Sequence, residues 1–354
     1  MTPSSFVTSS LQRPLRVGVI GAGYAGRMAH LPAWARVPGA AVVAVCDPDP
    51  AARAAAAPLA PGAASFTDHR ALLRGAHGLD AVSVCTPNAS HHEVALAALR
   101  AGAHVLCEKP LCANPADLRA LGAEAEARGL VLAVRHQLRF APGLAASRAR
   151  LASLGPLHTI RACARRRDRI PTTPGLTDAA LSGGGAALDL GVHVLDLALW
   201  LAGLADSAAV AGARVTGRAR DDYGRGRVPG YRNAWGPWDL SRFSVEDTAS
   251  ARFTLAGGVT IALECAWACE AAVDADEVGT WCEFTGSHGT WRWNALSSPT
   301  REAANPDPDF NAFAESCRSG IPFPVSWREA LASLELLDAF YRSVREGREV
   351  EVGA

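Results

Sequence analysis

The clearest chemical signal in the sequence is a glycine-rich loop that directly follows an apolar run, Gly21-Ala22-Gly23-Tyr24-Ala25-Gly26. Because they lack side chains, Gly21 and Gly23 permit a tight turn and let the backbone approach a pyrophosphate, while Gly26 allows a helix to pack closely. The N-terminus of that helix would offer free N–H groups to phosphate oxygens. The loop therefore predicts a dinucleotide site.

An acidic residue supports this prediction and indicates which dinucleotide binds. The next apolar run ends at Asp47, 21 residues after Gly26, where a carboxylate accepts hydrogen bonds from the adenosine ribose hydroxyls. Arg53 lies six residues further on and could turn toward a 2′-phosphate. We expect NAD, with NADP less favoured, because Asp47 would repel that phosphate.

Two further motifs follow later apolar runs, Cys85-Thr86-Pro87-Asn88 and Glu108-Lys109-Pro110. In a doubly wound sheet, ligands bind outside the carboxyl ends of the strands. Both motifs should therefore line the cofactor cleft, with Lys109 held beside a proline. The predicted cofactor contacts from these segments are Thr86, Pro87, Asn88, His91, Glu108 and Lys109.

The elements that must position these residues follow from the apolar patterning. Within the first 135 residues, short β-branched runs alternate with Ala- and Leu-rich stretches, which predicts an α/β fold with a doubly wound parallel sheet of the Rossmann type. After about Phe140, alternating strands and Gly turns predict an α+β domain with a large, open, mostly antiparallel sheet. We expect a flexible tail at 1–14, an NAD-binding domain at 15–138 and a substrate and oligomerisation domain at 139–354.

The composition restricts the partners. The 354 residues carry 35 basic and 35 acidic side chains, and 49 % of them are hydrophobic, so no overall field would recruit nucleic acid or a membrane surface. The chain start lacks a signal-peptide core, and the nine cysteines contain no CxxC pair and indicate reduced thiols with no metal site. We expect a cytoplasmic protein with a small-molecule partner.

Together, these motifs resemble the glucose-fructose oxidoreductase and inositol dehydrogenase family, Gfo/Idh/MocA. The resemblance covers the chain from about Leu15 to the C-terminal helix. It rests on the motifs above and on three more segments, Gln137 to Phe140, Gly183 to Asp196 and Thr285 to Thr290. It implies a Rossmann domain followed by an α+β domain whose sheet often mediates dimers or tetramers, and it adds Gln137 to the cofactor contacts.

The resemblance also implies three catalytic positions, namely Lys109, Asp189 and His193. Residues four apart on a helix share a face, which groups Asp189 with His193, and Asp196 should join them. Polar groups in so apolar a helix cost free energy unless they are paired or used. His193 is the preferred general acid or base, because its ordinary pKa lies near neutrality.

The predicted activity is transfer of a hydride between nicotinamide and a secondary alcohol or ketone of a sugar or cyclitol. An NAD-dependent glycoside hydrolase of the same fold and a non-catalytic NAD-binding sensor are the alternatives. Acidic residues cluster at 221–222, 246–247 and 274–277, and such clusters are usually solvated surface. If one of them lines the cleft, its field would favour a cationic substrate such as an amino sugar or aminoglycoside. The candidate substrate contacts are Arg165, Asp196, Trp235 and Trp238.

Oligomerisation is predicted from tryptophans on the strands of the second domain, at 267, 281, 291 and 293. If these side chains pointed outward, they would form an apolar face that needs cover. We therefore expect a homo-oligomer, either a dimer or a tetramer.

Overall fold

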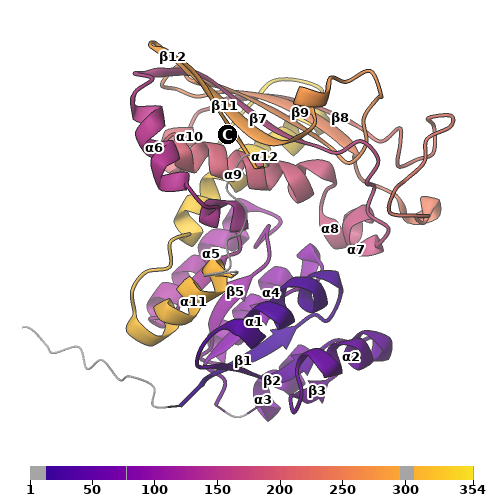
Figure 1. The fold of residues 1–354 in the computed structure, drawn as a ribbon, viewed down its shortest axis with the longest axis vertical. Coiled ribbons are helices and arrows are strands. Elements are labelled where there is room, and N and C mark those ends of the chain that lie inside the picture. The colour runs from indigo at the N-terminus through magenta and orange to yellow at the C-terminus, as the bar shows by residue number, and fades with distance from the viewer. Residues whose placement is uncertain (1–12, 77, 296–306, 354) are drawn as a thin grey trace, which may run out of the picture.

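The computed structural model describes residues 13–76, 78–295 and 307–353, so most of the predicted tail at 1–14 lies outside the described residues. A parallel sheet with its helices forms one part of the molecule. A larger sheet lies above it in Figure 1, with a layer of helices between the two.

The N-terminal sheet has six parallel strands in the order β3-β2-β1-β4-β5-β6, which is the Rossmann arrangement. Its strands are β1 Leu15–Ile20, β2 Ala40–Cys46, β3 Ala64–Phe66, β4 Ala81–Val84, β5 His104–Cys107 and β6 Leu132–Val134. The connecting helices are η1 Gly26–His30, α1 Leu31–Arg36, α2 Pro50–Ala56, η2 Ala57–Leu59, α3 His69–Gly75, α4 Asn88–Arg100 and α5 Pro115–Ala127. The predicted fold class is confirmed.

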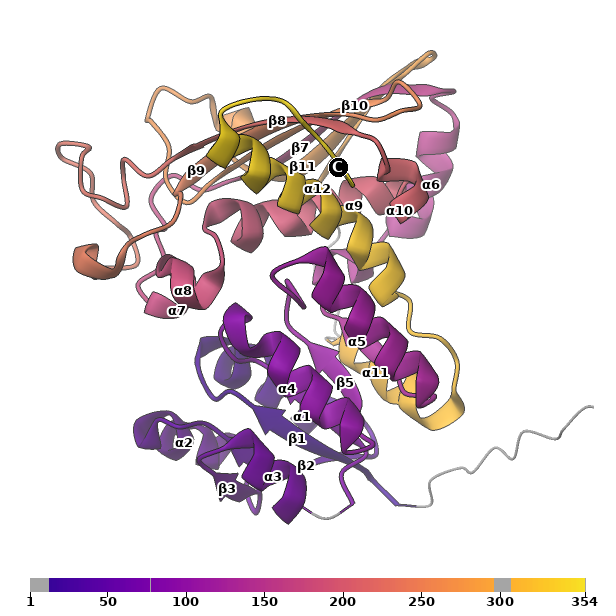
Figure 2. The same ribbon diagram turned by 180° about the vertical axis from the view of Figure 1, so that it is seen from behind.

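The second sheet has seven strands in the order β12-β11-β7-β10-β9-β8-β13, and only the β7–β10 pair is parallel. Its strands are β7 Leu157–Arg165, β8 Arg214–Arg220, β9 Thr248–Thr254, β10 Thr260–Ala266, β11 Gly279–Gly286, β12 Gly289–Asn294 and β13 Val350–Glu351. One face is covered by the long helices (Figure 2), whereas the short turn η6 Ala275–Glu277 lies against the other face, where Glu277 pairs with Arg161 and Arg165. We call these the helix-side face and the open face.

Apart from η6, most of the remaining helices lie between the sheets or along their edges. They are η3 Gln137–Phe140, α6 Leu144–Ala152, α7 Pro174–Thr177, α8 Ala179–Ser182, η4 Ala187–Gly191, α9 Val192–Leu201, α10 Ser207–Val210, η5 Leu240–Arg242, η6 Ala275–Glu277, α11 Pro308–Ser319 and α12 Trp327–Glu346. Ser326 and Glu329 form a capping box, which fixes the start of α12.

The chain returns to the N-terminal domain near its C-terminus. Phe310 and Phe313 of α11 are fully buried in the core around Trp34. Leu331 and Leu334 of α12 belong to the other core of the same domain. The arrangement thus differs from the simple division at residue 138, because apolar side chains from 310–334 cover the Rossmann sheet.

One helical stretch, Ala179–Leu201, is long and apolar enough to cross a membrane, but 78 % of its most apolar window is buried inside the protein. A buried core helix has the same composition. The stretch therefore gives no support for a membrane span.

Candidate active site

The glycine loop has the geometry that a dinucleotide requires. Gly21 has a φ of 98°, and a Cβ there would lie 2.5 Å from the backbone of Cys85. A Cβ on Gly26 would lie 2.1 Å from the Gly21 oxygen, whereas one on Gly23 would meet nothing within 4 Å. Two glycines are thus needed for packing, and the third leaves space where a pyrophosphate can approach the backbone. Tyr24, at 74 % exposure, lies at the rim of this loop with Ala25.

Asp47 lies beside that loop at the end of β2. Its carboxylate accepts hydrogen bonds from the Ala22 N–H, at 2.7 Å, and from the Asp49 N–H, at 2.9 Å. Arg53 donates to the carbonyl oxygens of Asp47 and Pro48. The acid is thus fixed next to the glycine loop, with lone pairs left for ribose hydroxyls.

Lys109 and Asp189 meet as the resemblance implied. The Lys109 Nζ donates to the Oδ1 and to the carbonyl oxygen of Asp189, both at 2.9 Å. The other carboxylate oxygen, Oδ2, accepts from the Trp267 Nε1–H at 2.8 Å. Lys109 follows β5 and Asp189 lies in the π-helical turn η4, so the pair joins the two domains.

His193 is one turn further along, on α9. Burial lowers the pKa of this histidine well below its ordinary value, and the charge of Lys109 adds to the effect. Its Nδ1 is shielded from solvent and has no hydrogen-bond partner among the described residues. The ring is therefore a neutral imidazole at neutral pH, and His193 as a whole is only partly buried, so a ligand can reach it.

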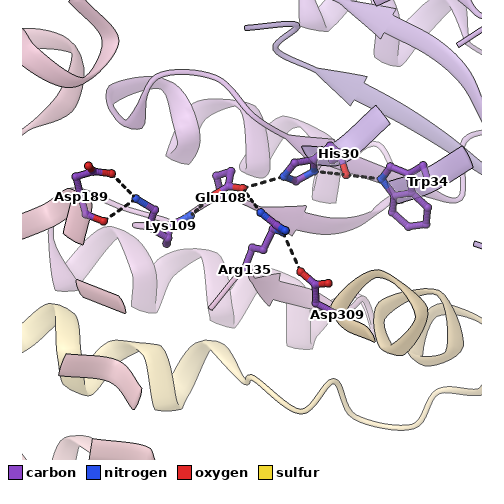
Figure 3. Close-up of polar contacts among 8 residues, drawn as sticks. His30, Trp34, Glu108, Lys109, Arg135, Asp189 and Asp309 are labelled. Atoms are coloured by element: carbon purple, nitrogen blue, oxygen red, sulfur yellow. Dashed lines mark hydrogen bonds and ion pairs between the residues drawn. The ribbon is translucent and has the colours of Figure 1, made fainter. Parts of the chain in front are cut away.

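Glu108 precedes Lys109 but belongs to a separate group of side chains, which we call the Glu108 cluster (Figure 3). Its Oε1 accepts from His30 Nε2, at 3.0 Å, and from an Arg135 nitrogen, at 2.9 Å. Arg135 also binds Asp309 of α11. The members are Trp34, Ser83, His30, Glu108, Arg135 and Asp309.

The Glu108 side chain is used within this cluster, and its contact with the cofactor stays a prediction. Burial raises the pKa of Glu108, but the His30 bond and the Arg135 charge outweigh it and hold that pKa well below its ordinary value. The carboxylate is thus an ionised centre that anchors the end of β5. It thereby fixes the position of Lys109, the next residue in the chain.

Other predicted cofactor residues brace the loops of the cleft. The fully buried His91 ring lies 2.7 Å from the carbonyl oxygens of both Thr86 and Pro110. Asn88 follows Pro87 and donates to the Ser182 carbonyl of the second domain at 2.8 Å. The ring thus braces the loops at Thr86 and Pro110, and a direct contact of His91 with a cofactor stays a prediction.

Two predicted cofactor contacts retain unsatisfied groups. Thr86 Oγ1 and Gln137 Oε1 are buried and have no hydrogen-bond partner among the described residues. A buried polar atom without a partner costs free energy, which a bound ligand can recover. With Gly23 and Asp47, these residues fit a bound dinucleotide.

Asp196 is misassigned as a substrate residue. Its carboxylate is 1 % exposed and accepts two hydrogen bonds from Arg139, at 2.6 and 2.7 Å. Asp196 also lies 3.6 Å from Nδ1 of His136, whose ring contacts His193 edge to face. The helical spacing correctly predicted that Asp196 lies on the same helix as His193. In the structure, however, its carboxylate is buried beneath the site.

Arg165 is also misassigned, because it lies on the wrong face of the sheet. Along β7, Ile160, Ala162 and Ala164 belong to the helix-side core, so Arg165 points to the open face. There it pairs with Glu264, at 3.1 Å, and with Glu277, at 3.6 Å. It cannot reach a substrate in the cleft.

The 221–244 loop is held by its own residues and by hydrogen bonds to the 168–179 segment, among them Asn233 with Ile170 and Arg242 with Asp178. Trp238 donates to the Gly224 carbonyl at 2.8 Å and packs against Tyr231, so it is a structural residue of the loop. Trp235 is 55 % exposed. No described contact joins either tryptophan to Asp189 or Lys109.

The acidic clusters do not form an anionic cleft. Glu246 accepts from the N–H groups of Gly185 and Ala187, and so caps the helical run that carries Asp189. Asp247 accepts from the Gly224 N–H. The acids at 221–222 and Glu277 are paired with arginines. The basis for a cationic substrate is therefore lost.

The tryptophans predicted to form an outward apolar face are mostly buried. Trp267, Trp281 and Trp293 are at most 5 % exposed. Trp281 does lie on the open face, but Arg161 and Arg292 cover its ring. Oligomerisation thus stays a prediction without this argument. The sequence did not identify Trp267 as a site residue. The only signal that could have found it is its position directly after β10.

The fold and the site define a two-domain, NAD-binding oxidoreductase. Residues 15–136 match the family described as "Oxidoreductase family, NAD-binding Rossmann fold", and residues 146–292 match the Gfo/Idh/MocA C-terminal domain. The chain belongs to the Gfo/Idh/MocA family.

Several relatives are dehydrogenases of sugars. The chain is 34 % identical to D-glucoside 3-dehydrogenase of Escherichia coli (strain K12), over 75 % of this chain and 72 % of that protein. It is 30 % identical to D-apiose dehydrogenase of Paraburkholderia graminis, over 98 % and 92 %. Among solved structures, GenD2 from gentamicin A biosynthesis in complex with NAD is 25 % identical, with full coverage of both chains and a TM-score of 0.76. The chain is thus a dehydrogenase acting on CH–OH groups of sugars.

Proposed function

We propose that this protein is an NAD(H)-dependent dehydrogenase of a ring hydroxyl in a glycoside-type sugar or a cyclitol. The observation that carries the proposal is the Lys109–Asp189 pair, with His193 close by, at the end of β5 in a Rossmann sheet. Ligands bind at this end of such sheets. When bound, NAD supplies the nicotinamide carbon that exchanges a hydride with the substrate.

Each residue of the site has a role that its contacts support. The Lys109 ammonium has three N–H donors, and two of them bind Asp189. The third can bind the reacting oxygen of the substrate. Asp189, itself held by Trp267, keeps the ammonium in this position.

His193 supplies the acceptor for the hydroxyl proton. Its low pKa keeps the ring neutral, so a ring nitrogen can accept a hydrogen bond from the substrate hydroxyl. In the reverse direction, the protonated ring returns that proton to the carbonyl oxygen. Burial of the site excludes water from this exchange.

NAD is the preferred cofactor in this proposal. Asp47 is fixed beside the glycine loop by two backbone N–H groups. Its charge opposes a 2′-phosphate. Arg53 does not offset that charge in the same way, because it is hydrogen-bonded to backbone carbonyl groups.

The names of the relatives suggest which sugars to test. D-glucoside 3-dehydrogenase and D-apiose dehydrogenase favour unmodified sugars, and GenD2, from gentamicin A biosynthesis, is the support for an amino sugar or aminoglycoside. A direct experiment mixes the purified protein with NAD or NADP and a panel of glucosides, apiose, inositols and amino sugars. The formation of NADH and of ketone product is then measured.

The proposal expects net accumulation of NADH in step with the ketone for at least one sugar. Release of free sugar from a glycoside without accumulating NADH would instead support the redox-neutral hydrolase. Tight binding of NADH with no turnover of any panel member would favour a sensor and overturn the proposal.

A further inference from the structure

Four arginines, at 165, 166, 167 and 169, lie at the end of β7 and directly after it, and the alternation of side chains decides which of them can reach the site. Arg165 is paired in register with Ala266 of β10, and it faces the open side. The next residues on the two strands, Arg166 and Trp267, must then lie on the helix-side face. Trp267 does so, because its ring binds Asp189.

Arg166 is therefore a neighbour of the catalytic pair. Its backbone N–H donates to the Ala266 carbonyl at 2.8 Å, immediately before Trp267 in the chain. Its side chain reaches Thr280 Oγ1 at 3.2 Å, and Thr280 pairs with the helix-side residue Ala164. The turn η4, which holds Asp189, packs on both β7 and β10.

The charge of Arg166 is not neutralised by a carboxylate. Within residues 13–76, 78–295 and 307–353, Arg166 forms no ion pair, and its side-chain hydrogen bonds come from a single guanidinium nitrogen, to Arg165 O and Thr280 Oγ1. Burial and the nearby Arg169 charge lower the pKa of Arg166, while Asp189 opposes them. Asp189 itself is already paired with Lys109.

The Arg166 N–H groups that have no partner among the described residues are not fully buried, so they stay open to a ligand. The paired donors of arginine fit the oxygens of a carboxylate or phosphate. Resting on the proposed function, we infer that Arg166 binds an anionic oxygen group on the substrate, so the sugar carries a carboxylate or a phosphate ester. This makes Arg166 the residue that sets substrate charge.

The experiment compares sugars that share a ring and differ in charge. Binding to the NADH-loaded protein is measured by calorimetry for methyl glucoside, methyl glucuronide, glucose 1-phosphate and UDP-glucose. The glucuronide tests a carboxylate, and the last two test a phosphate. The variants are Arg166→Gln, Arg166→Lys and, as a control with the same charge change on the opposite face, Arg165→Gln.

We expect the wild type to bind at least one anionic sugar about tenfold or more tightly than methyl glucoside, as charge-assisted hydrogen bonds predict. Arg166→Gln should remove this difference and leave the affinity for methyl glucoside unchanged. Arg166→Lys should restore part of it, because the charge remains without the paired donors. Arg165→Gln should behave like the wild type.

Equal affinity of the wild type for charged and neutral sugars would overturn the inference, as would the absence of binding by every anionic sugar. An equal loss in Arg165→Gln and Arg166→Gln would also overturn it. The proposed function and this inference can fail independently of each other. An anionic sugar bound through Arg166 but never oxidised leaves the anion site standing, whereas oxidation of neutral sugars without charge preference leaves only the dehydrogenase standing.

Discussion

Glu108 and Lys109 are consecutive residues, yet they belong to two polar groups that differ in how completely their hydrogen bonds are made. In the Glu108 cluster, Trp34 donates to Ser83, Ser83 lies within hydrogen-bond distance of His30, and His30 donates to Glu108. Every one of these groups has a partner within the protein. Such a network stabilises one conformation.

The Lys109 site, consisting of Lys109, Asp189, His193 and Trp267, is incomplete by comparison. His193 Nδ1 and the nearby predicted cofactor contacts Thr86 and Gln137 have buried atoms without partners among the described residues. Unsatisfied groups cost stability, so their concentration beside a charged pair indicates a ligand site. The comparison separates residues that hold the fold from residues that await a substrate.

The largest effect should follow from Lys109→Ala, which removes the cation of the Lys109 site. Turnover should fall roughly a hundredfold or more, because the reacting oxygen loses its bound donor. The affinity for NADH, measured by fluorescence titration, should stay within about twofold, since the glycine loop is untouched. Wild-type turnover in this variant would remove Lys109 from the mechanism.

The matching test of the Glu108 cluster is the substitution Glu108→Gln. It leaves the buried Arg135 without one of its two acidic partners, and the free energy of unfolding should fall by about 3 kcal/mol, as for other broken buried pairs. Urea denaturation measures this loss. The control is Glu93→Gln at an exposed ion pair with Arg70, where we expect less than about 1 kcal/mol. Equal losses in the two variants would mean that the Glu108 cluster is not a structural centre.

The sequence predicted the first domain more accurately than the second, for a physical reason. Strands buried on both faces are continuous apolar runs, and the short apolar runs of the first 135 residues form strands such as Leu15–Ile20 and His104–Cys107. Only the short β3, with two exposed residues out of three, had no such signal. The glycine loop, Asp47 and the Lys109 motif were found because local chain geometry determines them.

In the second domain, function depends on which face a residue occupies, and a shift of one residue reverses the face. Choosing Arg165 therefore selected a residue on the side away from the site. The role of Trp267 and the packing of α11 on the first domain arise from contacts between distant segments. The patterning of a single segment does not encode such contacts.

Acidic pH should lower the free energy of unfolding, because His136, which lies between the Glu108 cluster and the Lys109 site, is almost fully buried. Burial lowers the pKa of His136 to about 4, so the unfolded chain binds a proton at a higher pH than the folded one. Its contribution to stability is complete above about pH 6.5, is lost as the pH falls toward 4, and amounts to about 2 kcal/mol by pH 5. Urea denaturation at pH 7 and pH 5 measures it, and His136→Asn should show a smaller loss over the same interval. An equal loss in variant and wild type would show that His136 does not carry this pH dependence.

The smallest effect is expected for the affinity for the cofactor, which Asp47 influences from its position beside the glycine loop. Asp47→Ala removes a ribose acceptor and a charge opposed to the 2′-phosphate. It also releases the Ala22 N–H that the carboxylate holds at 2.7 Å. The affinity for NAD should fall about tenfold, since one or two hydrogen bonds are lost, and the affinity for NADP should stay the same or rise. Titration of both reduced cofactors measures the ratio, and Asp49→Ala is the control, because that side chain caps α2 and makes no described contact with the glycine loop. A wild type that already prefers NADPH would contradict the role given to Asp47, and the bonded Arg53 would then have to turn away from its carbonyl partners to meet the phosphate.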